Sequence, residues 1–126
     1  MNRYYSFLIN REKETNKMNE ELRNSIKKEL EKSIISITNQ FGAIQKIIVF
    51  GSFVNGGFNK FSDIDMYMMG LGAEDYFEVK RILEDMIDTD VDLYNDSDRE
   101  EYIEKIKKRG VLIYERKTGI IDSQPS

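Results

Sequence analysis

The sequence of 126 residues contains no cysteine and no histidine, and its single proline is Pro125. Without thiols or imidazoles the chain cannot form disulfides, zinc sites with thiolate or imidazole ligands, or a Ser-His-Asp triad. Acid–base catalysis by histidine is excluded as well. The chemistry that remains belongs to carboxylates, amines, hydroxyls, the backbone and divalent cations that prefer oxygen ligands.

Long apolar runs and an excess of positive charge are also missing. The apolar stretch at residues 4–9 is too short to span a bilayer and lacks the features of a signal peptide, so we expect a cytoplasmic protein that does not bind membranes. The formal net charge of −4 argues against a non-specific nucleic-acid binder, which would carry an excess of lysine and arginine. Nucleotides as ligands are not excluded.

Apolar periodicity predicts one small domain of alternating helices and strands. From Met18 to Phe41 apolar residues recur every three or four positions, which predicts a long amphipathic helix closed by Gly42. Strands are expected at 47–50, 63–69, 91–94 and 111–114. A helix is expected at 74–87, with the side chains of Phe77, Ile82, Leu83 and Met86 inward. Another helix is expected to begin at a capping box of Ser97 and Glu100 and to end at Gly110. We therefore expect an α/β (α+β) fold with a small mixed β-sheet flanked by helices.

The ends of the chain fit this pattern less well. Residues 1–17 match no element and are interpreted as a loosely ordered N-terminal arm or as residues upstream of the natural start. The domain itself is expected to span residues 18–116, followed by a loose C-terminal tail at 117–126.

Two aspartates on one predicted strand, Asp63 and Asp65, need an explanation. Side chains alternate along a strand, so both carboxylates lie on one face with Cα atoms roughly 6.5–7 Å apart. Aspartate is depleted in strands, and like charges on one face repel. A solvated strand edge is the ordinary interpretation of such a pair. A divalent cation between the carboxylates is the interpretation that removes the repulsion.

A third acid, Asp92, lies between Val91 and Leu93 and thus on the polar face of another predicted strand. If the two strands are neighbours, the three carboxylates form a set of hard oxygen ligands suited to Mg²⁺ or Mn²⁺. Two such ions about 3.5–4 Å apart can clamp the attacking and leaving oxygens of a displacement at phosphorus.

The Gly51-Ser52 pair directly follows a predicted buried strand and supplies a phosphate-compatible turn. Glycine lets phosphate approach the backbone closely, and the serine hydroxyl and nearby N–H groups are donors for anionic oxygens. No Gly-Lys-Ser/Thr follows, so this is not a Walker A loop. An ordinary turn or helix-capping serine is the alternative interpretation of Ser52.

Together, Gly51-Ser52, the following ten residues, Asp63-Ile64-Asp65 and the later Asp92 resemble the signature of the DNA polymerase β-like nucleotidyltransferase superfamily. The short chain resembles the minimal nucleotidyltransferases, which are often encoded beside a HEPN-domain partner in prokaryotic toxin–antitoxin pairs. The resemblance covers residues 18–114.

This resemblance implies a nucleotidyltransferase fold and transfer of AMP from ATP to a hydroxyl, with two Mg²⁺ or Mn²⁺ ions per site. It implies that Asp63 and Asp65 hold both metals, that Asp92 completes the site of the ion that activates the acceptor, and that Gly51 and Ser52 bind the β- and γ-phosphates. The implied acceptor is a tyrosine of a HEPN ribonuclease toxin, which would make the chain an antitoxin. The alternatives are a non-catalytic antitoxin that acts by binding, and a small-molecule enzyme of the aminoglycoside nucleotidyltransferase type.

Overall fold

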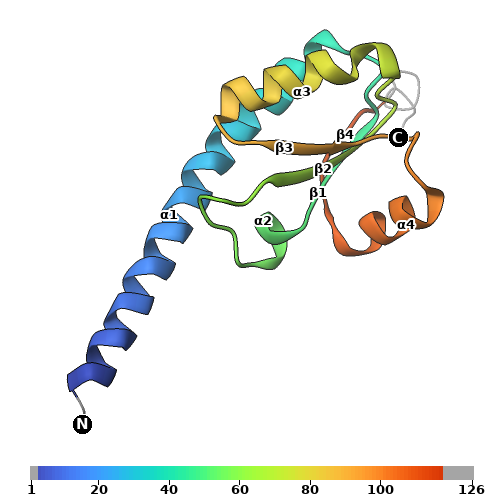
Figure 1. Ribbon diagram of the computed structural model, residues 1–126. Helices are drawn as coiled ribbons and strands as arrows, with labels where there is room; N and C mark the ends of the chain where they lie inside the picture. The colour runs from blue at the N-terminus through green and yellow to red at the C-terminus, as the bar shows by residue number, and fades with distance from the viewer. Residues whose placement is uncertain (1–2, 118–126) are drawn as a thin grey trace, which may run out of the picture.

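The computed structural model describes the backbone of residues 3–117 and the side chains of residues 16–117. In chain order the elements are α1 (Arg3–Gln40), β1 (Lys46–Phe50), α2 (Ser52–Asn55), β2 (Ile64–Met69), α3 (Ala73–Ile87), β3 (Val91–Tyr94), α4 (Glu100–Arg109) and β4 (Val111–Glu115). The four strands form one mixed sheet flanked by helices, as the sequence predicts (Figure 1). None of the helices within the described part of the chain is long and apolar enough to cross a membrane.

The strand order is β3-β2-β1-β4. β1 pairs antiparallel with both β2 and β4, whereas β2 and β3 run parallel. The parallel pair needs a crossover connection, which α3 provides. The order places β2 in the interior of the sheet between β1 and β3, so the two acid-bearing strands of the sequence analysis are direct neighbours.

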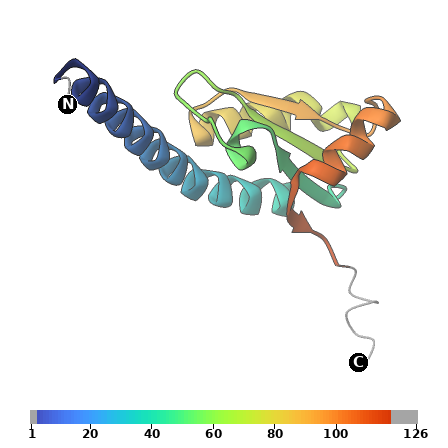
Figure 2. The ribbon, with the colours of Figure 1, turned by 90° about the horizontal axis from the view of Figure 1, so that it is seen from below.

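One face of the sheet is covered by α1 and α3, which lie side by side on it (Figures 1 and 2). The apolar positions Ile26, Leu30, Ile34 and Ile37 of α1 are buried there, which confirms the predicted periodicity. The side chains that the sheet contributes to this core are Ile47, Val49, Ile64, Met66, Met68, Val91 and Leu93. Burial of this face by hydrophobic contact is the main source of the fold's stability.

The opposite face carries a smaller core under α4, made by Ile48, Tyr67, Ile103 and Ile106. Gly110 follows α4 with φ of −86°, so its backbone needs no left-handed conformation. Its role is steric, because a Cβ there would lie 2.4 Å from Cγ2 of Ile48. The same face also carries Phe50 and Tyr94, which pack against this core, and the carboxylates of Asp65 and Asp92.

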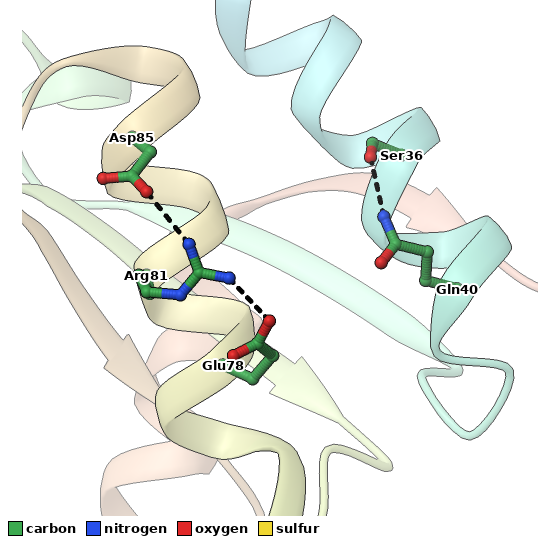
Figure 3. A network of polar contacts seen from close by, with 5 residues as sticks. All are labelled: Ser36, Gln40, Glu78, Arg81 and Asp85. Atoms are coloured by element: carbon green, nitrogen blue, oxygen red, sulfur yellow. Dashed lines mark hydrogen bonds and ion pairs between the residues drawn. The ribbon is translucent and has the colours of Figure 1, made fainter.

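The outer faces of the helices are solvated. On α3 the guanidinium of Arg81 pairs with Glu78 at 2.6 Å and with Asp85 at 3.1 Å, and on α1 the Gln40 amide donates to the Ser36 hydroxyl (Figure 3). Such exposed pairs contribute little to stability. They keep these faces polar.

Several details differ from the sequence predictions. Helix α1 begins at Arg3 rather than at Met18, so residues 3–17 continue the helix, and it ends at Gln40. The N-terminal half of α1 extends past the sheet (Figure 1). Strand β2 begins at Ile64, which leaves Asp63 immediately before it. The predicted tail lies outside the described residues except for Lys117.

Two predictions for the helices are wrong. The Phe77 side chain is 78% exposed, because Val79, Leu83 and Ile87 make the buried stripe of α3. The capping box at Ser97 does not form. The residue preceding α4 is Arg99, no side chain caps the helix, and the Ser97 hydroxyl instead donates to Asn95 Oδ1 at 2.5 Å.

Candidate active site

Three carboxylates predicted from the sequence gather at one end of the β2–β3 pair. Asp65 on β2 is the direct register partner of Asp92 on β3, and Asp63 lies just before β2. All three precede or alternate with residues buried under α1 and α3, so they belong to the sheet face that carries α4. Asp63 and Asp92 are exposed and Asp65 is half-buried. The structure thus brings together the acids that the sequence analysis singled out.

Gly51 lies against the Asp65 carboxylate. It adopts φ of +76°, a conformation that residues with a Cβ rarely adopt. A Cβ built at Gly51 would lie 2.1 Å from Asp65 Oδ2, which leaves no room for any other residue. The turn after β1 and the Asp65 carboxylate are therefore in contact.

Asp65 lies in an environment that disfavours its charged form. Burial first, and then the negative charges of Asp92 and Asp63, together raise the pKa of Asp65 from 3.8 to about 6. A carboxylate whose pKa is raised by burial and by neighbouring negative charges is typical of the groups found at functional sites.

A divalent cation fits this donor set chemically, since the three side chains offer only hard carboxylate oxygens and their charges repel. Within the described residues, however, no three acids stand close enough together to form a ready metal-ligand group. The charge effects on Asp65 reach over longer distances than metal–ligand bonds do. The carboxylates therefore have the right chemistry for a metal, although the described side chains do not themselves form a metal-ligand cluster.

Ser52 opens the short helix α2, and the turn around it is closed by backbone bonds from Asn55 N and Val54 N to Gly51 O at 2.9 and 3.2 Å. The Ser52 side chain is half-buried and lines a groove of about 270 Å³ between α1 and the turn. Gly56 and Gly57, both with positive φ, line the same groove.

Arg23 of α1 is a residue at this turn that sequence reasoning missed. Its Nε donates to the carbonyl oxygen of Phe53 at 2.6 Å, and its guanidinium lies 4.8 Å from the centroid of the Phe53 ring. In the sequence the charged face of this helix reads as solvated surface. No local pattern distinguishes Arg23 from its charged neighbours, because the contact joins positions 30 residues apart.

An aromatic cluster lies beside Asp92. The rings of Phe50, Tyr94 and Tyr102 stack pairwise with centroid distances of 5.3 to 6.4 Å. The Tyr94 hydroxyl donates to Asp92 Oδ2 at 3.3 Å. A hydrogen bond with Tyr102, burial and the negative charge of Asp92 all raise the pKa of Tyr94. The structure thus groups Tyr94 and Tyr102 beside one of the acids.

A carboxylate outside the acid set fixes the loop that follows β2. Asp96 accepts a hydrogen bond from the Tyr67 hydroxyl and one from Gly70 N at 2.8 Å. Burial, followed by the hydrogen bond to Asp96, raises the pKa of Tyr67. Tyr67 is buried in the smaller core, so this pair ties the β3–α4 loop to the interior strand.

A shallow groove of about 430 Å³ borders Asp92 on the open side of β3. Its walls include the exposed ring of Phe77 and the ring of Tyr76, which meet edge to face at 5.2 Å. The Tyr76 hydroxyl donates to Leu93 O at 2.5 Å, which holds this wall against the edge strand. The edge of the sheet nearest Asp92 is thus accessible and partly apolar.

Comparison with known proteins assigns this arrangement to a class. The family model of the polymerase β nucleotidyltransferases matches residues 32–119, so the chain belongs to that family. This match includes the Gly-Ser turn and all three acids. A search of curated protein sequences finds no match.

Solved structures share the fold. A toxin–antitoxin structure with AMP-PNP is 25% identical, with a TM-score of 0.58, and the match covers 73% of this chain and 77% of that one. A variant of the toxin–antitoxin complex MntA–HpeT is also 25% identical, with a TM-score of 0.55 and coverage of 73% and 76%. A protein described as a minimal nucleotidyltransferase is 17% identical, with a TM-score of 0.59 and coverage of 71% and 93%. The neighbours are thus toxin–antitoxin proteins and minimal nucleotidyltransferases.

Proposed function

We propose that this nucleotidyltransferase transfers AMP from ATP to a hydroxyl of a partner protein, and that it acts as the antitoxin of a HEPN ribonuclease toxin. The observation that carries the proposal is the register pairing of Asp65 with Asp92, with Gly51 in contact with Asp65. This contact joins the acids to the turn expected to bind phosphate. The similarity to a toxin–antitoxin protein solved with AMP-PNP supports ATP as the donor.

In this reaction the acceptor oxygen attacks the α-phosphorus of ATP, and the bond from that phosphorus to the bridging oxygen breaks, so that pyrophosphate leaves. Gly51 and Ser52 bind the β- and γ-phosphates. Asp92, exposed on the edge strand, accepts the proton of the incoming hydroxyl. Two Mg²⁺ or Mn²⁺ ions held by Asp63, Asp65 and Asp92 would neutralise the phosphate charge and lower the pKa of the acceptor.

The acceptor comes from another protein in this proposal. The groove at Asp92 is shallow, open and bordered by the exposed Phe77 ring, which suits a protein surface better than a small molecule that must be enclosed. A tyrosine of the HEPN toxin is the proposed acceptor, and its modification would silence the toxin.

Mass spectrometry of the HEPN partner after incubation with this protein, ATP and Mg²⁺ tests the proposal. The partner should gain the mass of one or more AMP groups on tyrosine, and the Asp63→Ala/Asp65→Ala variant should produce no gain. Asp85→Asn is a matched control, because it removes a carboxylate from the solvated face of α3 and should transfer normally.

The binding antitoxin remains the second candidate, and the apolar border of the Asp92 groove is the observation in its favour. Protection of cells by the double alanine variant at the level of the wild type, without any AMP on the toxin, would refute the enzymatic proposal in favour of this one.

A further inference from the structure

The geometry points to Arg23 as a ligand of the terminal phosphates of the nucleoside triphosphate, in a subsite built jointly by α1 and the Gly-Ser turn. This inference rests on the proposed function and adds to it a binding residue from outside the Gly-Ser and D-x-D motifs. It assigns to α1, which otherwise serves as a cover for the sheet, a direct part in substrate binding.

The Arg23 guanidinium is held in place before any ligand arrives. Nε donates to Phe53 O at 2.6 Å, and the plane of the side chain is supported by the Phe53 ring at 4.8 Å. Phe53 is itself 4% exposed and meets the Phe58 ring edge to face at 5.1 Å. Immobilising a long side chain in advance lowers the entropic cost of binding.

Most of the Arg23 donors remain available for a ligand. A guanidinium has five N–H donors, and Nε uses one of them on Phe53 O. No carboxylate of the described residues lies within 4.0 Å of the Arg23 nitrogens. Planar forks of this kind bind phosphate oxygens in pairs, with more geometric selectivity than lysine has.

The groove that Arg23 lines is rich in hydrogen-bond donors. The groove, of about 270 Å³, also contains the Ser52 side chain and the bare backbone of Gly56 and Gly57, around which a Cβ would meet no atom within 4 Å. Arg23 is the one cation among the described residues that line it, and Glu20 is the one anion. The Gly56 N–H already donates to Ser52 O at 3.0 Å, so the donors of the groove are the Ser52 hydroxyl, the Gly57 backbone N–H and the guanidinium, and this set suits an anionic, oxygen-rich ligand.

The groove that Arg23 lines adjoins the turn that contacts the acids. Gly51 touches the Asp65 carboxylate, and the next residue, Ser52, lines the groove together with Arg23. A triphosphate whose α-phosphorus is near the acids would run along this turn towards Arg23. The other basic side chain near the acids, Lys60, lies over the Phe61 ring and lines a different groove with Asp63 and Asp90. Lys60 therefore lies outside the groove that Arg23 lines.

The test measures the affinity of the wild type, Arg23→Gln and Arg23→Lys for ATP, ADP, AMP and inorganic triphosphate in the presence of Mg²⁺. Arg23→Gln should weaken ATP and triphosphate binding about 10–100-fold, ADP less, and AMP hardly at all. Arg23→Lys should recover only part of the loss. A purely structural role would weaken all four ligands equally, or none of them, and either pattern would overturn the inference.

Lys27→Gln is the matched control. It lies one turn further along α1, carries the same charge and does not line the groove at Ser52. It should leave all four affinities unchanged, and an equal loss in this variant would reduce the Arg23 effect to net charge, which would overturn the inference. Inorganic triphosphate separates this inference from the proposed function. Wild-type binding of triphosphate that Arg23→Gln abolishes would support the subsite even if no AMP transfer occurs, whereas binding of neither triphosphate nor ATP would refute both.

Discussion

Replacing Asp65 with asparagine should make the protein without bound metal or nucleotide more stable while abolishing AMP transfer. In the folded protein burial and the charges of Asp92 and Asp63 raise the pKa of Asp65 to about 6, from 3.8. The folded state therefore holds this proton more tightly than the unfolded chain does, and ionisation of Asp65 costs folding free energy. Asparagine has nearly the same shape as the protonated acid and cannot ionise.

The expected gain in the free energy of unfolding follows from the pKa shift of Asp65. About two pKa units correspond to about 3 kcal/mol, and because Asp65 is only half-buried we reduce this to about 1–2 kcal/mol for solvent screening. The sign is set by proton binding. The stability that Asp65 contributes is fully present below about pH 4, decreases as the pH rises to about 6, and is absent above that. The variant should equal the wild type at pH 4 and exceed it at pH 7.5.

Urea unfolding of both proteins across this pH range, in EDTA, measures the effect, and taking the difference between them cancels the other titrating groups. In urea the gain at pH 7.5 should appear as a higher midpoint concentration, and in thermal melts of the same samples as a rise in Tm of about 3–8 °C. Asp85→Asn is the control of opposite sign, because it loses an ion pair to Arg81 and should be neutral or slightly destabilised. A variant at Asp65 that is less stable than the wild type at pH 7.5 would show that this carboxylate is a structural hydrogen-bonding group, and the reasoning would fail.

Three further predictions concern the frame of the site. Gly51→Ala should cost about 1–2 kcal/mol from its positive φ alone and more from the clash with Asp65, so in chemical denaturation Asp65→Ala should recover part of the loss. Asp96→Ala should destabilise by about 1–3 kcal/mol in the same assay, because the Tyr67 hydroxyl loses its acceptor inside the smaller core. On α3, Leu83→Ala should cost about 2–5 kcal/mol and Phe77→Ala no more than about 0.5, since the first side chain is fully buried and the second exposed; equal losses in thermal melts would contradict the assignment.

Periodicity predicted most of the fold because each buried stripe faces one continuous core. The spacing of Ile26, Leu30 and Ile34 fixes which face of α1 is buried. The same rule failed for Phe77, where a large apolar residue lies one position away from the stripe that Val79 and Leu83 define. A large apolar residue is not buried when its position along the helix places it on the solvent-facing side.

The acids were predictable for a different reason. Asp63, Asp65 and Asp92 each break the apolar character of a strand, and such local conflicts are visible in sequence. Their adjacency required β2 and β3 to be neighbours, which the sheet order confirms. Arg23 was not predictable, because an arginine on a charged helix face conflicts with nothing nearby. Only the packing of α1 on the turn after β1 reveals it.

Calorimetric titration of ATP tests the central claim, that three acids and a glycine turn form one metal-dependent nucleotide site. With Mg²⁺ the wild type should bind ATP, and EDTA or Asp65→Asn should remove the binding, whereas Asp85→Asn should bind as the wild type does. If ATP binds equally well in EDTA, or if the Asp65 variant binds it unchanged with Mg²⁺, the site does not work as described.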